Sequence, residues 1–341
     1  MNIKITDSWL REYLNTEATP RQIADSLSLS GPTVEKLNQV GQDFVYDIEI
    51  TSNRVDMASV IGIAREANAI LPRMGFKTSL NKIELSSKNE SSISSLPLII
   101  QDKNHLCSRI MAVVLDNLNV SKSPEFIRKR LEQAGIRSLN NIVDITNYVM
   151  LEIGQPVHAF DYDRIKTHSL ILRLAKKGEV ITTLDEKKYT LDEKDVIIDD
   201  GTGTIIDLPG IMGTLNSVVV DETRRIILFI ESNDPVSIRR TSMKYGIRTM
   251  AATINEKNPD TQLVETAILR GIKLYQDTSQ AKIASAITDI YPRKPQIKSI
   301  EISTEFISKR TGINHSNKEI SDILTSLQFQ VESKNNNLYV T

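Results

Sequence analysis

Residues 140–161 of the chain read NNIVDITNYVMLEIGQPVHAFD. The stretch is apolar and helix-like, but it includes the polar residues Asp144, Asn147 and Gln155. Polar side chains inside such a segment usually form internal hydrogen bonds and seldom perform catalysis. We therefore interpret the segment as a structural element, and we expect these three side chains to form hydrogen bonds inside the protein.

The region around this stretch, residues 96–292, is predicted to be a mixed α+β domain. Helices are expected at residues 123–135 and 261–275, and strands at residues 97–100, 110–115, 170–174, 195–199, 217–220 and 225–230. Strands and helices do not alternate regularly in this order, so a parallel βαβ sheet is not expected. The glycine-rich residues 201–204 predict a hairpin turn rather than a phosphate-binding loop.

Residues 1–83 predict a small mixed α/β domain. Thr19-Pro20-Arg21-Gln22 has the cap residue, the proline and the glutamine of a helix start. A strand is expected over residues 44–50, and a second helix is expected to begin at Ser59. Residues 84–95 are polar and serine-rich, which is typical of a linker.

Residues 293–341 predict a third unit. Ser316 and Glu319 have the spacing of a capping box, and apolar residues follow at helical intervals. The last expected strand stops beside Thr341, where a natural terminus rarely falls, so we expect the chain to be a fragment. The predicted fold class is therefore α+β and multidomain.

Composition narrows the class of protein. The chain has 341 residues, 40% of them apolar and 25% charged, as in soluble globular proteins. It has no apolar run of roughly 18 residues and no signal peptide. Cys107 is its single cysteine, so no internal disulfide can form and a cytoplasmic location is expected. The four histidines show no metal-ligand spacing, and a net charge of −1 argues against general nucleic-acid affinity.

Common catalytic and nucleotide-binding motifs are absent from the sequence. There is no GxGxxG motif after a strand, no Walker loop and no GxSxG elbow. The residues alone therefore predict a cytoplasmic α+β protein with a pocket of unassigned chemistry.

Several segments match one family closely. Residues 140–161 resemble a long signature of the bacterial phenylalanyl-tRNA synthetase (phenylalanine–tRNA ligase) β subunit. Four further segments resemble the same family, namely NRVD at 53–56 with GIARE at 62–66, PGIMG at 209–213, DPVSIRRT at 234–241 and GIRT at 246–249. The similarity spans essentially the whole chain, which therefore resembles the N-terminal portion of such a subunit.

The resemblance implies a domain plan and a set of partners. Residues 96–292 would be the family's editing-type domain, and residues 293–341 the truncated start of a winged-helix-like domain. The usual oligonucleotide-binding insert would be missing from residues 1–83, because Val40-Gly41-Gln42 leads straight into a strand. The catalytic-like and anticodon-binding domains and the magnesium-binding segment would lie beyond Thr341.

The family also implies a ligase that uses ATP and Mg²⁺ and assembles as two α and two β subunits with tRNA(Phe). We expect this segment itself to bind neither cofactor, to hold no metal and to have no membrane association. No residue of this chain is assigned to the aminoacylation reaction.

The resemblance further implies an editing pocket that hydrolyses tyrosine wrongly esterified to tRNA(Phe). A carboxylate that accepts a hydrogen bond from the tyrosine hydroxyl suits this task, because phenylalanine would leave the buried acid unpaired. His158 matches the family's histidine, Gly213 its turn glycine, and Thr249 and Ala251 its small pocket residues.

The family's acid is not matched in an ungapped alignment, which places Phe229 at its position. Glu231 lies two residues later, about 6.6 Å along the same face of a strand, and could take over the role. The alternative is that Glu231 ends the strand in solvent. The chain also departs from the family at Thr214, Ile254 and Asn255, which replace a glycine, an arginine and a phenylalanine.

Three functions are therefore expected as alternatives. The first is a subunit portion of phenylalanine–tRNA ligase in translation, with a retained but weakened Tyr-tRNA(Phe) editing domain. The second is an active aminoacyl-tRNA deacylase that uses Glu231. The third is a non-catalytic interaction module for the α subunit.

Overall fold

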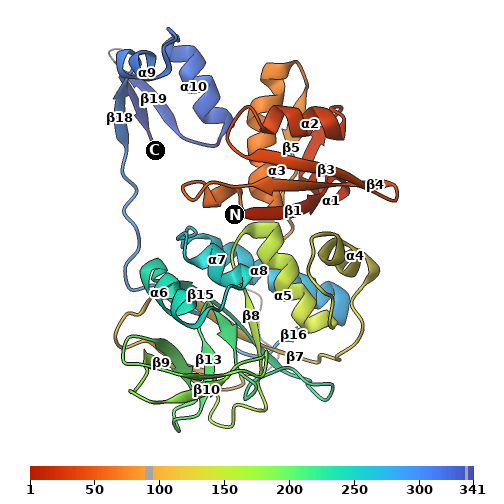
Figure 1. The fold of residues 1–341 in the computed structure, drawn as a ribbon, viewed down its shortest axis with the longest axis vertical. Coiled ribbons are helices and arrows are strands. Elements are labelled where there is room, and N and C mark those ends of the chain that lie inside the picture. Colours follow the sequence, from red (N-terminus) through yellow and green to blue (C-terminus); the bar gives the residue numbers. More distant parts are fainter. Residues whose placement is uncertain (89–94, 335–336) are drawn as a thin grey trace.

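The computed structural model describes residues 1–88, 95–334 and 337–341. The first part of the chain forms a unit of short strands and helices (Figure 1). Its elements are β1 (Asn2–Thr6), α1 (Asp7–Tyr13), β2 (Leu14–Thr16), α2 (Pro20–Leu27), β3 (Thr33–Val40), β4 (Asp43–Glu49), α3 (Val60–Ile70) and β5 (Thr78–Leu80). One sheet has the order β1-β4-β3, and β2 pairs with β5.

Local sequence signals explain where these elements begin. Thr19 and Gln22 form the predicted capping box at the start of α2, and the Ser59 hydroxyl accepts from the Gly62 N–H at the start of α3. Gly41 has a φ of +64° and joins β3 to β4 in a tight turn. The two strands are therefore connected directly.

The central part of the chain contains two sheets. One has the order β16-β7-β15-β8, with β17 also paired to β7, and the other has the order β14-β13-β12-β9-β6. The strands are β6 (Ile99–Gln101), β7 (Cys107–Asp116), β8 (His158–Asp161), β9 (Ser169–Leu174), β12 (Val196–Asp199), β13 (Ile205–Leu208), β14 (Met212–Gly213), β15 (Ile226–Asn233), β16 (Lys282–Ile283) and β17 (Thr288–Ile290). Residues 201–204 join β12 to β13 in an antiparallel hairpin, which confirms the predicted turn.

Apolar side chains hold these sheets in layers. Side chains of β15 alternate, so that Leu228 joins a core with helices α5 and α8 while Phe229 joins a core with the second sheet. The helices are α4 (Glu125–Gln133), α5 (Asn141–Ile153), α6 (Pro235–Tyr245), α7 (Met250–Asn255) and α8 (Leu263–Ser279). A third core lies between the second sheet, the hairpin of β10 (Val180–Thr182) and β11 (Lys188–Thr190), and helices α6 and α7.

One predicted strand does not form. Residues 217–220 are irregular, because the Ser217 hydroxyl donates to the Ile206 carbonyl (2.9 Å) and its own carbonyl accepts from the Asp161 N–H (3.0 Å). The prediction of a strand there was wrong, since the apolar pair Val218 and Val219 faces a cavity instead of joining a ladder.

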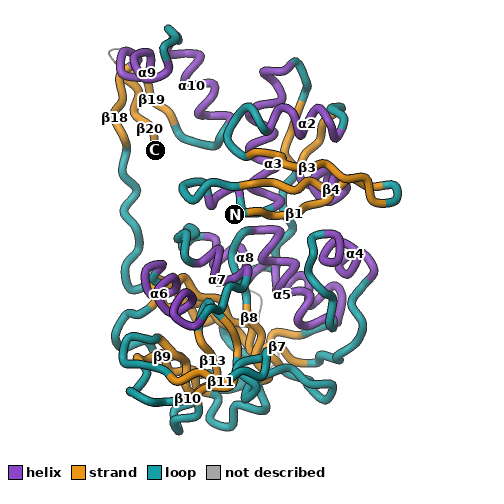
Figure 2. Tube along the Cα trace, in the orientation of Figure 1, coloured by secondary structure: helices purple, strands orange, loops and turns teal. Residues whose placement is uncertain are grey.

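The N-terminal unit is fixed to helices α5 and α8, which lie between it and the central strands (Figure 2). Glu152 of α5 is fully buried and accepts hydrogen bonds from Arg270 (2.7 and 3.0 Å) and from the Tyr13 hydroxyl (2.5 Å). Trp9 stacks on Tyr148 with 4.3 Å between ring centroids. The two parts of the chain therefore share one core and one buried charged network.

Part of the predicted linker packs against α8. The Ser86 N–H donates to the Leu269 carbonyl (3.2 Å), and Lys88 forms an ion pair with Glu265 (2.7 Å). Residues 89–94 of that prediction lie outside the described residues.

The last part of the chain follows an extended segment and forms a separate small unit (Figure 1). Its elements are β18 (Ile300–Ser303), α9 (Thr304–Thr311), α10 (Asn317–Ser326), β19 (Val331–Lys334) and β20 (Asn337–Val340). Ser316 caps α10 by accepting from the Glu319 N–H (3.2 Å). The strands form a sheet of order β18-β20-β19.

The buried network at Glu152 predicts a large effect on stability. Glu152→Ala would leave the Arg270 charge and the Tyr13 hydroxyl unpaired, so we expect the free energy of unfolding to fall by about 3–5 kcal/mol in urea titrations. Glu305→Ala is the matched control, because its ion pair with Lys309 is exposed and screened by solvent, so its loss should leave the free energy of unfolding nearly unchanged. Equal losses in the two variants would contradict this prediction.

Candidate functional site

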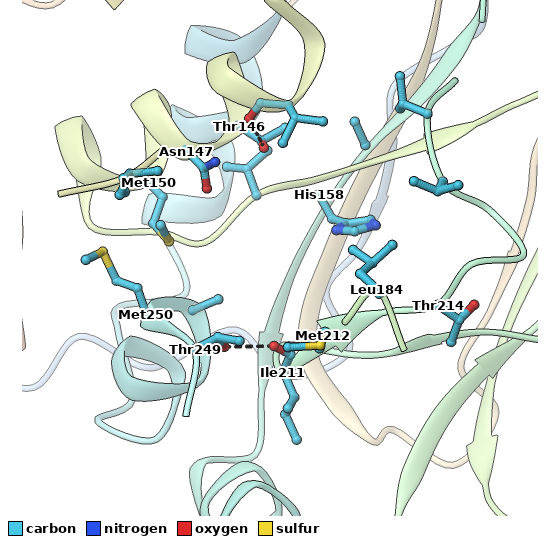
Figure 3. A pocket seen from close by; sticks show the side chains of 18 of the residues that line it. Thr146, Asn147, Met150, His158, Leu184, Ile211, Met212, Thr214, Thr249 and Met250 are labelled. Atoms are coloured by element: carbon cyan, nitrogen blue, oxygen red, sulfur yellow. Dashed lines mark hydrogen bonds between the residues drawn. The ribbon is translucent and has the colours of Figure 1, made fainter. Parts of the chain in front are cut away.

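A cavity of about 530 Å³ opens beside α5, where the edge strands β8 and β14 of the two central sheets approach each other. Figure 3 shows its wall, with Asn147 and Met150 of α5 facing Met250 at the start of α7. Its lining is mostly apolar, and its few polar side chains are Thr146, Asn147, His158, Asp185, Thr214 and Thr249. Such a shape and lining are typical of a small-molecule or substrate site.

Two of the polar residues in the opening stretch are internal bonding partners, as predicted. Asp144 accepts from the hydroxyls of Ser123 and Ser138 and from the Leu139 N–H. The Gln155 amide donates to the Glu231 carbonyl (3.0 Å).

Asn147 differs from them. Its carboxamide faces the cavity and has no hydrogen-bond partner in the described part of the chain, so the prediction of an internal role was wrong there.

His158 lies at the start of β8 and faces the cavity. Its ring packs 4.3 Å from the Phe160 ring, measured between centroids, and no hydrogen bond to it forms within the described chain. The ring is reached by solvent through the cavity but is otherwise enclosed, and this burial lowers the pKa of His158 to about 4. The imidazole is therefore neutral near pH 7.

The turn between β13 and β14 brings main chain close to the histidine. A Cβ atom on Gly213 would lie 3.1 Å from His158 Cε1, so a larger residue there would press on the ring. Gly210 has a φ of +68°, and a Cβ atom on it would lie 2.4 Å from Asn233 Nδ2. Both glycines therefore permit close approaches that other residues would obstruct.

Thr249 and Ala251 stand at the opposite wall. The Thr249 hydroxyl caps α7 by accepting from the Ala252 N–H (3.0 Å), and it donates to the Ile211 carbonyl (2.8 Å). Thr249 thus fastens the start of α7 to the glycine turn. Ala251 lines the cavity with a single methyl group, which leaves space beside Gly213.

A second, smaller pocket of about 60 Å³ adjoins the cavity at His158. His158, Gly213 and Ala251 line both spaces, and Glu231 and Asp207 line only the smaller one. The structure therefore brings five of the six predicted site residues to two adjoining pockets, namely His158, Gly213, Glu231, Thr249 and Ala251.

Phe229 is the sixth predicted residue, and it lies elsewhere. Its side chain is fully buried in the core between the two central sheets, 5.6 Å from the Phe160 ring between centroids. It pairs with His158 in the β15–β8 ladder but does not line the cavity. Phe229 therefore packs in the core between the two central sheets and has a structural role.

Glu231 does not end β15 in solvent. The strand continues to Asn233, and Glu231 is 6% exposed. Asn233 Nδ2 donates to Glu231 Oε1 (3.3 Å), and the Gly210 main chain also bonds to this carboxyl group. Burial outweighs these bonds and raises the pKa of Glu231 to about 7.

The three departures from the family pattern have local explanations. The Thr214 hydroxyl donates to the Ile206 carbonyl (2.9 Å). Ile254 is fully buried, and Asn255 Nδ2 donates to the Gly210 carbonyl (3.1 Å). Asn255 thus supports the same turn that borders Glu231, while its own Oδ1 is buried without a partner among the described residues.

Asp207 is a pocket residue that the sequence analysis missed. It lies in the apolar run Ile205-Ile206-Asp207-Leu208, is 3% exposed, and stands opposite Gly213 in the β13–β14 ladder. A single acid inside an otherwise apolar strand was the signal that could have identified it.

Residues 1–88, 95–334 and 337–341 contain neither a candidate metal centre nor a membrane-spanning helix. No group of three His, Cys, Asp or Glu side chains is placed to hold a metal ion there. Nor does this part of the chain contain a helix with the length and hydropathy needed to cross a membrane.

Comparison with known proteins identifies related chains. Residues 106–280 match the family model described as the B3/4 domain. The phenylalanine–tRNA ligase β subunit of Clostridium acetobutylicum is 40% identical over 296 residues, which are 87% of this chain and 37% of that protein. The Thermotoga maritima subunit is 39% identical over 290 residues, 85% of this chain and 36% of that protein. The chain thus spans little more than a third of these relatives.

A solved structure has a similar fold. It is an N-terminal fragment of the phenylalanyl-tRNA synthetase β subunit from Pyrococcus horikoshii, with a TM-score of 0.50 and 15% identity. The match covers all of this chain and 93% of that one. At this identity, the similarity supports the mixed α+β multidomain fold alone.

The buried acid predicts a pH-dependent stability. Because folding raises the pKa of Glu231 from 4.5 to about 7, the folded chain binds this proton more tightly than the unfolded chain. The stability of the folded chain is therefore highest, as far as Glu231 is concerned, below about pH 4.5, where both states are protonated. It falls as the pH rises through 7, where Glu231 ionises in the folded chain as well. Glu231→Gln should therefore gain stability relative to the parent between about pH 5 and pH 8, on the order of 2–3 kcal/mol.

Thermal unfolding at the two pH values measures this effect. Glu222→Gln is the control, because Glu222 is an exposed carboxylate outside the cavity. A stability difference between Glu231→Gln and the parent that stays constant with pH would show that Glu231 titrates normally.

Proposed function

Because the chain belongs to the phenylalanine–tRNA ligase β-subunit family, we propose that its cavity removes tyrosine from wrongly charged tRNA(Phe). The observation that carries this proposal is the buried carboxyl group of Glu231 in a small pocket that adjoins a mostly apolar cavity. The ring of a tyrosyl ester would occupy the apolar part, and its hydroxyl would reach Glu231.

Glu231 would provide the discrimination between tyrosine and phenylalanine. A phenol hydroxyl that enters the smaller pocket gives the carboxyl group a hydrogen-bond partner. Phenylalanine would exclude water from the pocket without supplying that partner, which costs about 1–3 kcal/mol. A site that hydrogen-bonds one hydroxyl can therefore reject the analogue that lacks it.

Hydrolysis would take place nearer the mouth of the cavity. The oxygen of a water molecule attacks the ester carbonyl carbon, the bond to the ribose oxygen breaks, and free tyrosine and tRNA with its hydroxyl restored are released. His158 is neutral at pH 7 and can accept a hydrogen bond from that water, which would orient it. With a pKa of about 4 it is a weak base, so its role is positioning more than proton removal.

The wider setting is part of the same proposal. The chain would act in the cytoplasm as part of a ligase that also contains an α subunit, in an assembly of two α and two β subunits that binds tRNA(Phe). ATP and Mg²⁺ would serve aminoacylation in the intact enzyme. No step of the hydrolysis described above uses either of them.

A weakened editing domain is the second candidate function. Ile254 and Asn255 replace an arginine and a phenylalanine of the family pattern, and neither replacement offers the cavity a positive charge. If tRNA binding depended on that charge, the domain would have a mainly architectural role. An interaction module for the α subunit without tRNA chemistry is the third candidate.

Deacylation of Tyr-tRNA(Phe) by this chain tests the proposal directly. We expect the parent chain to exceed the spontaneous rate and to spare Phe-tRNA(Phe). Glu231→Leu should reduce the preference for tyrosine about tenfold or more, because it removes the hydroxyl's partner. Glu222→Gln is the surface control. Loss of Tyr-tRNA(Phe) at the spontaneous rate, alone and with an α subunit present, would favour the architectural role.

His158 should affect rate more than selectivity. His158→Ala removes the water's partner but leaves the hydroxyl-reading pocket intact, so we expect deacylation to slow by about tenfold or more at unchanged preference for tyrosine. Because its pKa is about 4, the rate should not fall between about pH 8 and pH 6 through protonation of His158. A rate that halves near pH 6.5 in the parent but not in His158→Ala would contradict this assignment.

A further inference from the structure

Glu231 shares its pocket with a second acid. Asp207 of β13 lines the same space of about 60 Å³, and it is 3% exposed. No side chain of residues 1–88, 95–334 or 337–341 donates a hydrogen bond to its carboxyl group. The main chain of Leu208 forms a hydrogen bond with it. A buried carboxyl group without a side-chain partner, aimed into a cavity, is available to a ligand.

The charges around this pair do not stabilise two carboxylates. The pocket is lined by Pro156, Val157, His158, Asp207, Gly210, Ile211, Met212, Gly213, Glu231 and Ala251, so His158 is its sole basic side chain. Burial keeps that imidazole neutral. Burial and the nearby Glu231 raise the pKa of Asp207 well above its ordinary range, and burial raises that of Glu231. Like charges in one enclosed space do not both ionise easily.

The remaining neighbours do not supply a charge either. The buried Cys107 thiol of β7 donates to Asn233 Oδ1 (3.3 Å), and Asn233 Nδ2 donates to Glu231 (3.3 Å). Burial raises the pKa of Cys107, so it stays a neutral thiol. Asp102, whose carboxylate accepts from the Leu106 and Cys107 N–H groups, adds negative charge behind them. None of these neighbouring groups therefore places a positive charge beside the two acids.

We propose that Asp207 and Glu231 share one proton and together read the substrate hydroxyl, one as acceptor and the other as donor. This inference rests on the proposed function of the cavity. A hydroxyl group donates one hydrogen bond and accepts others, so a carboxylate beside a carboxylic acid complements it on both sides. A lone carboxylate would satisfy only its hydrogen.

The pair narrows the class of substrate. Aminoacyl esters with an aromatic ring that ends in a hydroxyl fit it, because they supply both a hydrogen and a lone pair. A 4-fluorophenyl ring of similar size supplies no hydrogen, so it leaves the carboxylate unpaired and should be spared like phenylalanine. Two unpaired groups in place of one also strengthen the rejection of phenylalanine.

A stability cycle tests the shared proton without any substrate. The parent, Asp207→Asn, Glu231→Gln and the double variant are unfolded thermally at about pH 5 and pH 8, with Glu222→Gln as the surface control. We expect each single variant to raise the midpoint at pH 8 by about 2–4 °C or more, and the double variant to add little. Additive shifts at pH 8 would show that the two acids titrate independently and would overturn the pair.

Deacylation tests whether the pair reads the hydroxyl. Asp207→Leu should lower the ratio of Tyr-tRNA(Phe) to Phe-tRNA(Phe) deacylation about tenfold. In the parent chain this ratio should decline as the pH rises above 7, because the pair then loses its shared proton. Asp207→Asn should keep the ratio and remove that decline, because an amide donates a hydrogen bond at any pH. Asp207→Leu with an unchanged ratio and an unchanged pH profile would overturn the reading role.

The two experiments separate this inference from the function on which it rests. A parent chain that does not deacylate Tyr-tRNA(Phe) overturns the proposed function and, with it, the reading of a hydroxyl, even where the stability cycle is non-additive. An active parent with additive stability shifts overturns the shared proton alone. Thermal unfolding of Asp207→Leu shows whether a loss of activity comes from the pocket or from a failure to fold.

Discussion

The register of β15 determines which side chains form the floor of the cavity. This strand is buried along its whole length and is paired with β7 on one side and β8 on the other. Its pleat sends Leu228 and Ile230 toward the helices, and Phe229 and Glu231 toward the second sheet. A slip of one residue would exchange the two faces and place Glu231 in the apolar core under the helices.

Helix α5 connects this floor to the rest of the chain. One side of the helix carries Tyr148 and Glu152, which pack and bond against the N-terminal unit, and another side carries Asn147 and Met150 of the cavity wall. Helix α5 therefore contacts both the N-terminal unit and the cavity wall. Cys107 and Asn233 connect the floor to β7 in a similar way, through the hydrogen bonds that end at Glu231.

Local patterns in the sequence were sufficient for much of the fold. The caps at Thr19, Ser59 and Ser316 and the turn at residues 201–204 depend on near neighbours, and all four formed as expected. The strand expected at residues 217–220 did not form, because the Ser217 hydroxyl bonds to a carbonyl of β13 that sequence patterns do not reveal.

Some residues of the site could be predicted from the sequence, while others depend on contacts between distant strands. The period of a strand placed Glu231 on the same side as Phe229, and the resemblance located His158, Gly213, Thr249 and Ala251. The resemblance could not show that Phe229 belongs to the core, because its packing against Phe160 depends on a strand that is distant in the sequence. Nor could it pair Asp207 with Glu231, since these residues come from strands of different sheets.

The two buried carboxyl groups of the pocket lower the stability of the folded chain when no ligand forms hydrogen bonds with them. Two carboxyl groups are enclosed without a cation, and the Oδ1 of Asn255 beside the glycine turn is also unpaired among the described residues. Well-packed apolar residues of similar volume would make this region more stable. Buried acids with raised pKa values are concentrated at functional sites, where the free energy lost on folding is recovered when a complementary ligand binds. The two acids line one pocket, which also includes His158, and this is the physical reason to place substrate recognition there.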